Sequence, residues 1–184
     1  MEMKAAIFLA TGYEMGEAII TIDLLRRTNI TVDIISIEND LAVTSSHNVK
    51  INCEKFIDKI NFKEYKMLVL PGGNLGVENL NKKQLLKSKL IEFAKDNNKI
   101  IAAICGAPQI LGQLNLLDNK VITDYPGASM GLNNSKIDLK KKVVVDGNII
   151  TGRSLGCVFE FGLTIIEKFL NKNSSENVKL KLVM

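Results

Sequence analysis

Short apolar runs alternate along this chain with longer stretches in which apolar residues recur every three or four positions. Largely apolar runs cover residues 4–9, 31–37, 67–70 and 100–104. Runs of this length predict buried strands, and the β-branched residues of the second run favour the same structure. The amphipathic stretches at 16–28, 83–96, 109–114 and 156–170 predict helices. The first helix ends in Arg26-Arg27, which suits the negative end of a helix dipole.

Weaker patterns lie between these elements. Residues 43–46 and 48–51 predict short strands around a turn, and 121–123 predicts another short strand. Two β-branched runs at 143–145 and 148–151, joined through Asp146-Gly147, give the clearest hairpin pattern in the chain. After the last helix, polar residues 171–177 suggest a loop. The final apolar positions, 178–182, must then dock on the protein or fray.

Strands that alternate with helices predict an α/β protein with a largely parallel sheet covered on both faces. We expect one domain over residues 1–184, because no linker, repeat or low-complexity segment divides the chain. In such sheets, ligands bind outside the carboxyl ends of the strands. Residues 10–17, 71–76 and 105–108 follow three of those ends, so we expect them to converge on one crevice.

Composition narrows the function classes. Of the 184 residues, 46% are hydrophobic and 24% charged, which is ordinary for a globular domain, and the net charge is +4. The lysines are scattered and only 5% of residues are aromatic, so a solvated surface is favoured over nucleic-acid binding. No apolar run approaches the roughly 20 residues that span a bilayer. The first run is short for a signal peptide, and we expect a cytoplasmic protein.

Three cysteines stand far apart, at Cys53, Cys105 and Cys157. Their odd number and the absence of a C-x-x-C pair argue against a disulfide framework and against a zinc site. We expect neither a metal nor a cofactor. Cys157 is expected to pack at the start of the last helix, and Cys53 to be a bystander or a residue near a dimer contact. The single histidine, His47, is expected on an exposed turn.

Cys105 is the main candidate for chemistry. It lies between a buried strand and a helix, followed by Gly106, which permits a sharp turn, and by Pro108, which suits a first helical turn. A thiol at the positive end of a helix is expected to favour the thiolate, as in a nucleophile elbow. The alternative is a small buried apolar residue, which is the usual role of a free cysteine.

Two further groups are expected near this cysteine. Gly72 and Gly73 follow a buried strand, and their backbone N–H groups could serve as oxyanion donors; the alternative is a plain tight turn. Glu14 and Glu17 open the first helix, where solvated carboxylates are common. A carboxyl that instead faces a thiolate would have a raised pKa, because two adjacent negative charges are costly. It could then act as an acid or a base.

Together these residues resemble the ThiJ/PfpI superfamily, and most closely its Parkinson-disease-associated branch, called DJ-one. The resemblance runs from about residue 4 to about residue 169. Its strongest pieces are Glu17 before Ile22-Asp-Leu-Leu-Arg-Arg27, Val69-Leu-Pro-Gly-Gly-Asn-Leu-Gly76, Ile101-Ala-Ala-Ile-Cys105 and Phe159-Glu-Phe161.

This resemblance implies a flavodoxin-like, Rossmann-like three-layer sandwich that forms a homodimer. It also implies that Cys105 is a nucleophilic, oxidation-sensitive thiol, that Glu17 is its partner, and that Gly72, Gly73 and Gly106 belong to the oxyanion pocket. One position departs from the family. Tyr125 stands before Pro126 where human-like members carry a histidine. With an ordinary pKa of about 10, a phenol is a poor base, so Tyr125 either orients substrate or forms the pocket wall.

Two sister families are excluded on residues. The intracellular proteases of the superfamily have histidine directly after the cysteine, and class I glutamine amidotransferases need one downstream; no histidine follows Cys105. The resemblance implies detoxification of reactive carbonyls, as a glutathione-independent glyoxalase or a deglycase of proteins and nucleotides. Its substrates would be small aldehydes or glycated side chains. The alternative is a non-catalytic redox sensor or holdase chaperone that uses the oxidisable Cys105.

Overall fold

A computed structural model describes residues 3–128 and 130–184. Its strands are β1 (Met3–Leu9), β2 (Ile30–Ser36), β3 (Ala42–Thr44), β4 (Lys50–Asn52), β5 (Lys55–Phe56), β6 (Met67–Leu70), β7 (Ile100–Ile104), β8 (Val121–Ile122), β9 (Lys136–Ile137), β10 (Val143–Asp146) and β11 (Ile149–Gly152). Its α-helices are α1 (Met15–Arg26), α2 (Asn74–Lys82), α3 (Gln84–Ala94), α4 (Pro108–Gln113), α5 (Val158–Phe169) and α6 (Lys172–Lys181). None of the described helices is long and apolar enough to span a bilayer.

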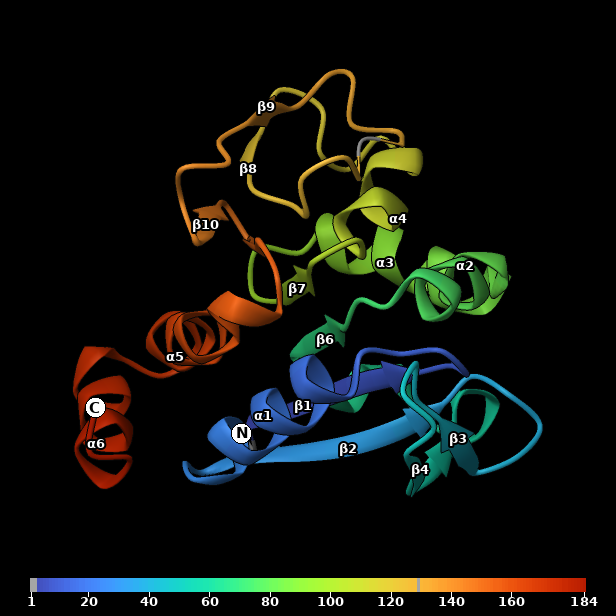
Figure 1. Ribbon diagram of the computed structural model, residues 1–184, viewed down its shortest axis with the longest axis horizontal. Coiled ribbons are helices and arrows are strands. Elements are labelled where there is room, and N and C mark those ends of the chain that lie inside the picture. Colours follow the sequence, from blue (N-terminus) through green and yellow to red (C-terminus); the bar gives the residue numbers. More distant parts are fainter. Residues whose placement is uncertain (1–2, 129) are drawn as a thin grey trace.

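A seven-stranded sheet in the order β10-β11-β7-β6-β1-β2-β5 forms the centre of the fold. All neighbours pair in parallel except the β10–β11 hairpin. The short pairs β3–β4 and β8–β9 lie outside this sheet (Figure 1). This is the predicted α/β flavodoxin-like sandwich, and strands β6 and β7 begin and end at the predicted residues.

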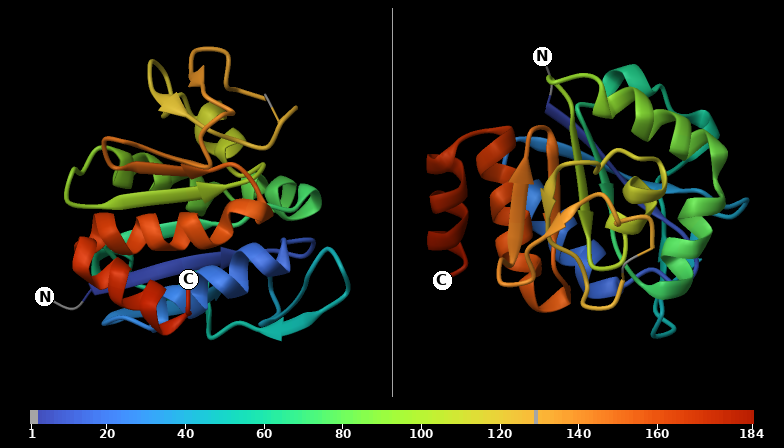
Figure 2. Two further views of the ribbon diagram at one scale, coloured as in Figure 1. Left: turned by 60° about the vertical axis from the view of Figure 1, so that its left-hand side comes forward. Right: turned by 90° about the horizontal axis from the view of Figure 1, so that it is seen from above.

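Two apolar cores lie on opposite faces of the sheet. Alternate residues of β1 enter different cores: Ile7 packs with α1 and α5, whereas Phe8 packs with α2, α3 and α4. Figure 2 shows α1 and α5 side by side over one face, with α6 against α5. Burial on both faces explains why the central strands are continuous apolar runs rather than alternating ones.

The expected loop at 171–177 is wrong, because α6 occupies it. Asn171 caps this helix by accepting the Ser174 N–H at 2.9 Å, and Val178 is buried. The buried Ser175 hydroxyl donates to the Leu163 carbonyl at 3.1 Å. A helix with so few apolar side chains contacts its neighbour along a narrow stripe, so its periodic pattern is weak. The sequence analysis also missed helix α2, which begins directly after the glycine turn.

Asp33 on β2 is a buried carboxylate held by three donors. Its Oδ2 accepts from Lys55 Nζ at 2.6 Å and from the Tyr65 hydroxyl at 2.5 Å, and Lys4 Nζ lies 3.2 Å away. Burial alone would raise the pKa of Asp33, but these donors outweigh it and hold the pKa below its ordinary value. The carboxylate therefore stabilises the fold at neutral pH, and this contribution is lost as the pH falls through the lowered pKa.

We expect Asp33→Asn to destabilise the protein by about 3 kcal/mol at pH 7, because it leaves buried donors without their charged acceptor. Urea unfolding measures this. Asp23→Asn is the control, since its partner is the exposed Arg27 at the C-cap of helix α1 and such pairs contribute about 0.5 kcal/mol. The difference between the variants should shrink on approaching pH 3. Equal effects at pH 7 would show that the Asp33 cluster adds no stability.

Candidate active site

Cys105 lies on a sharp turn between β7 and α4. Its φ is +63°, a region that residues other than glycine rarely occupy and that is concentrated at functional sites. Backbone hydrogen bonds fix the turn: the Cys105 N–H donates to the Gly152 carbonyl at 2.9 Å, and the Tyr125 N–H donates to the Cys105 carbonyl at 3.0 Å. The thiol is half-buried. This geometry holds it at the carboxyl end of the sheet, in reach of a ligand.

The carboxyl of Glu17 faces the thiol across Gly72. Glu17 is 1% exposed, and its Oε2 accepts the Gly72 N–H at 2.8 Å. A Cβ on Gly72 would lie 2.7 Å from that oxygen and 3.1 Å from Cys105 Sγ, so only glycine leaves room for both groups. The role expected for Gly72 changes accordingly, because its N–H positions Glu17 and is not free to serve as an oxyanion donor.

Gly73 and Gly106 supply the N–H groups that face the sulfur. Hydrogen bonds from both backbones act to lower the pKa of Cys105. The Gly73 backbone has a φ of +93° and packs against the Gly12–Glu14 segment, where the Glu14 N–H donates to the Gly72 carbonyl at 2.8 Å. The two donors are therefore rigidly placed for negative charge on the thiol or on an oxygen bound next to it.

Burial dominates the titration of Glu17. It raises the pKa of this carboxyl to about 7, although the Gly72 N–H and the thiol act in the opposite direction; the charge of Glu14 raises it further. Within the described part of the chain, Oε1 is buried and makes no hydrogen bond that meets normal geometry. Near neutral pH this carboxyl can therefore both give and take a proton.

Burial and the Glu17 charge raise the pKa of Cys105 to about 12, more than the Gly106 and Gly73 N–H groups lower it. The expectation that the helix end alone favours the thiolate is therefore wrong. Helix α4 has only six residues, and among the described residues the charged side chain that acts on the sulfur is the Glu17 carboxyl. Thiolate forms when the proton moves to Glu17, so the two groups titrate as a pair that holds one negative charge.

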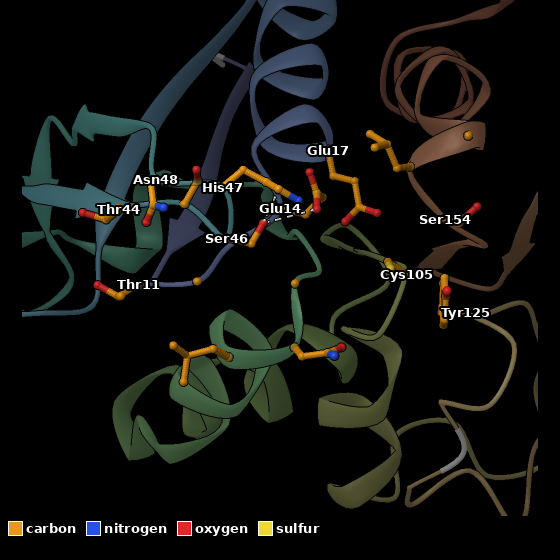
Figure 3. Close-up of a pocket in the computed structure, with 17 residues that line it drawn as sticks. Thr11, Glu14, Glu17, Thr44, Ser46, His47, Asn48, Cys105, Tyr125 and Ser154 are labelled. Carbon is orange, nitrogen blue, oxygen red and sulfur yellow. Dashed lines mark hydrogen bonds between the residues drawn. The ribbon is translucent and has the colours of Figure 1, made fainter.

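Cys105 and Glu17 line a pocket of about 780 Å³ at the carboxyl ends of β1, β6 and β7. The three segments expected to converge there do so. The other lining residues are Thr11, Gly12, Glu14, Thr44, Ser45, Ser46, His47, Asn48, Gly73, Asn74, Leu75, Tyr125, Ser154, Leu155 and Gly156. In Figure 3, Cys105, Tyr125 and Ser154 lie at one end of this pocket, and Thr44 and Asn48 lie at the other.

The protein-family comparison matches residues 3–168 to the family described as DJ-1/PfpI. The chain belongs to the DJ-1/PfpI family. The crystal structure of Drosophila melanogaster DJ-1beta has a TM-score of 0.94 and 32% identity to this DJ-1/PfpI chain, covering 100% of this chain and 99% of that one.

Two curated relatives bear on the function of this chain. Protein DJ-1 homolog B of Arabidopsis thaliana is 33% identical over 182 residues; the match covers 98% of this DJ-1/PfpI chain but 41% of the relative. The Schizosaccharomyces pombe protein named glutathione-independent glyoxalase DJ-1 is 29% identical over 190 residues, covering 99% of both chains. At this identity the activity in that name belongs to the yeast protein.

The far end of the pocket was missed by the sequence analysis of this DJ-1/PfpI chain. The β3–β4 turn lies against the end of β1, where the Gly12 N–H donates to the Thr44 carbonyl at 2.8 Å and the Ser46 N–H to the Tyr13 carbonyl at 2.9 Å. His47 is exposed on this turn as predicted, and it also lines the pocket. These contacts join segments about 30 residues apart, and the local sequence carries no sign of them.

Tyr125 lies in the pocket, whereas the two other cysteines lie outside its lining. Tyr125 is 51% exposed at the thiol end, in a position compatible with both roles considered for it. Cys157 is buried near the pocket wall, with its sulfur 3.9 Å from the Ser154 hydroxyl, and Cys53 is buried elsewhere in the core. Among residues 3–128 and 130–184, no three His, Cys, Asp or Glu side chains are arranged to hold a metal ion.

Proposed function

We propose that this protein detoxifies reactive carbonyl compounds through Cys105, as a glutathione-independent glyoxalase that also removes early aldehyde adducts from proteins and nucleotides. One observation carries the proposal: the Cys105 thiol and the buried Glu17 carboxyl, whose pKa is raised to about 7, meet at Gly72 beside the N–H donors of Gly73 and Gly106. A nucleophile, a proton carrier and an oxyanion site are the equipment for attack on an aldehyde.

The reaction on methylglyoxal follows from this geometry. The thiol proton passes to Glu17 and the sulfur attacks the aldehyde carbon, giving an oxyanion near the Gly73 and Gly106 N–H groups. Glu17 returns the proton to this oxygen, which completes the hemithioacetal and leaves Glu17 as a carboxylate. Glu17, as a carboxylate, removes the proton from that carbon and returns a proton to the neighbouring carbon, so that one carbon is oxidised and the other reduced. Water then hydrolyses the resulting thioester to lactate and restores the thiol.

Proton NMR of the reaction in D₂O tests the proposal. Lactate should accumulate from methylglyoxal without glutathione, and its C2 position should carry solvent deuterium, because Glu17 exchanges its proton with water. The absence of lactate would reject the glyoxalase proposal. Lactate without deuterium would reject proton transfer by an exchanging carboxyl.

A second candidate function rests on the same carboxyl. A protonated Glu17, with Oε1 unbonded among the described residues, can donate a hydrogen bond to an oxidised Cys105 sulfur and so favour the sulfinic acid. The protein would then act as a redox sensor or holdase chaperone. Intact-mass and peptide analysis after mild peroxide tests this, with the buried Cys53 and Cys157 as internal references. Oxygen on either of these before Cys105 would reject the sensor.

We also propose that the chain forms a homodimer, which the family resemblance implies. Light scattering should give about twice the chain mass of 20.3 kDa, and a monomer at micromolar concentration would reject the proposal.

Gly72→Ala should lower turnover of methylglyoxal by about 100-fold, because the added methyl group would lie 2.6 Å from Cys105 Cβ and would move the thiol or the carboxyl by about 1 Å. Gly147→Ala is the control, since Gly147 lies outside the pocket lining in the turn between β10 and β11, and the nearest atom to its added Cβ is the flexible end of Lys120, Nζ at 3.4 Å. Steady-state kinetics with a thermal melt of each variant measures the effect. Equal activity of the two variants would show that the spacing at Gly72 does not matter.

A further inference from the structure

The charge of the pocket wall differs from that of the whole chain. The chain has 24 Lys and Arg residues against 20 Asp and Glu, and its net charge is +4. Yet the pocket lining among the described residues includes the carboxyls of Glu14 and Glu17 and no lysine or arginine. A basic protein therefore presents an acidic pocket, and acidic walls favour neutral or cationic ligands over anions.

Glu14 is fixed in this wall by weak contacts. Its Oε1 accepts the Gly16 N–H and its Oε2 accepts the Ser46 hydroxyl, both at the long distance of 3.4 Å. These contacts set the direction of the carboxylate and leave much of its acceptor capacity for a ligand. Glu14 and Glu17 share the start of α1, and the charge of Glu14 acts on Glu17.

His47 adds a hydrogen-bond acceptor near the Glu14 carboxylate. Its Nδ1 lies 3.0 Å from the Ser46 hydroxyl oxygen. That hydroxyl has one proton, so when it donates to Glu14 it accepts from Nδ1–H, and Nε2 of the neutral ring is then an acceptor. Figure 3 shows Glu14, Ser46 and His47 together, away from Cys105. This end of the pocket therefore offers acceptors, whereas the thiol end offers the Gly73 and Gly106 donors.

The pocket is also larger than a three-carbon aldehyde needs. Its volume of about 780 Å³ falls in the range of about 300–1,000 Å³ that holds drug-sized ligands. With the carbonyl oxygen at the Gly73 and Gly106 N–H groups, the pocket leaves room for the group that carries the carbonyl to extend toward Glu14 and His47.

We propose that the preferred substrates are reactive carbonyls carried on a positively charged or hydrogen-bond-donating group, such as an amine or a hydroxylated chain. Glu14, with Ser46 and His47, recognises that group and disfavours phosphorylated or carboxylated carriers, so that among the proposed adducts those on protein amines are preferred over those on nucleotides. This inference rests on the proposed carbonyl chemistry at Cys105.

Matched phenylglyoxals test the preference, with a para trimethylammonium, hydroxyl or carboxylate group. The wild type should show kcat/KM about 10-fold higher for the cation than for the anion, the effect of one charge pair in a partly solvated pocket. Glu14→Gln should reduce that ratio about fivefold, and the ratio also cancels any general effect on Glu17. Glu167→Gln removes an exposed charge outside the pocket lining and should leave the ratio unchanged.

Alkylation of Cys105 gives a readout that needs no turnover. Intact-mass rates with iodoacetate and with a trimethylammonium iodoacetamide should show the same preference and the same loss in Glu14→Gln. If no phenylglyoxal is turned over while the labelling preference persists, the carbonyl proposal fails and the charge preference of the pocket stands. If the wild type does not discriminate, or Glu14→Gln discriminates equally, the inference is overturned.

Discussion

Cys105→Ser is expected to lower kcat/KM for lactate formation from methylglyoxal by at least about 10³-fold, the usual effect of losing a nucleophile. The reason lies in the partner group. A carboxyl with a pKa of about 7 can take a thiol proton, but it is far too weak a base for a hydroxyl. The N–H groups of Gly73 and Gly106 remain in place in this variant, so the change isolates the nucleophile. NMR detection of lactate at pH 7.5 measures the loss.

Cys157→Ser is the matched control, because it makes the same thiol-to-hydroxyl change at a buried sulfur outside the pocket lining. It should retain activity within about twofold, and thermal melts of both variants should show folded protein. Lactate formation at the wild-type rate by Cys105→Ser would remove the basis of the proposed function, whatever the control shows.

The fold was predictable from sequence where burial is complete. Strands β6 and β7 are covered on both faces, so every residue in them is apolar and their bounds could be read directly. Helix α6 was missed for the opposite reason: it buries Ser175 and Val178 and little else, so its pattern is that of a polar loop. Sequence periodicity reports the amount of apolar surface that an element buries, and it fails for elements that bury little.

Some features of the candidate site could be predicted from the sequence and others could not. Cys105 and Gly73 belong to turns that follow apolar strands, and the turns at the carboxyl ends of parallel strands share one edge of a sheet, so their proximity was predictable. Two features were not. Gly72 donates to Glu17, a contact across 55 residues, and the pKa of the thiol is raised where a short helix suggested a lowered one. Both depend on burial and on distances between separate segments, which local sequence does not encode.

Glu17→Gln is expected to reduce turnover and to increase stability at the same time. Loss of the group that moves the proton should lower kcat by about 10²- to 10⁴-fold. The amide oxygen can still accept the Gly72 N–H, so the turn should stay in place. Turnover near the wild-type level would show that another group carries the proton.

The thiol of this variant should become more reactive, because the Glu17 charge that raises the pKa of Cys105 is gone. Alkylation by iodoacetamide at pH 8 should therefore be faster than in the wild type, even though turnover is slower. This split distinguishes loss of a proton carrier from general damage to the site, which would slow both reactions. Slower labelling together with slower turnover would indicate such damage.

The stability gain follows from the raised pKa of Glu17. Its folded-state value of about 7 exceeds the ordinary 4.5, so the folded protein binds the proton more tightly than the unfolded chain does. The stabilisation that this proton gives is complete below pH 4.5, falls between pH 4.5 and 7, and is absent above pH 7. Glutamine cannot ionise, so Glu17→Gln should raise the free energy of unfolding by about 3 kcal/mol at pH 8 and by little at pH 4. Urea unfolding at the two pH values measures this, and an equal change at both would show that the pKa of Glu17 is not raised in the folded protein.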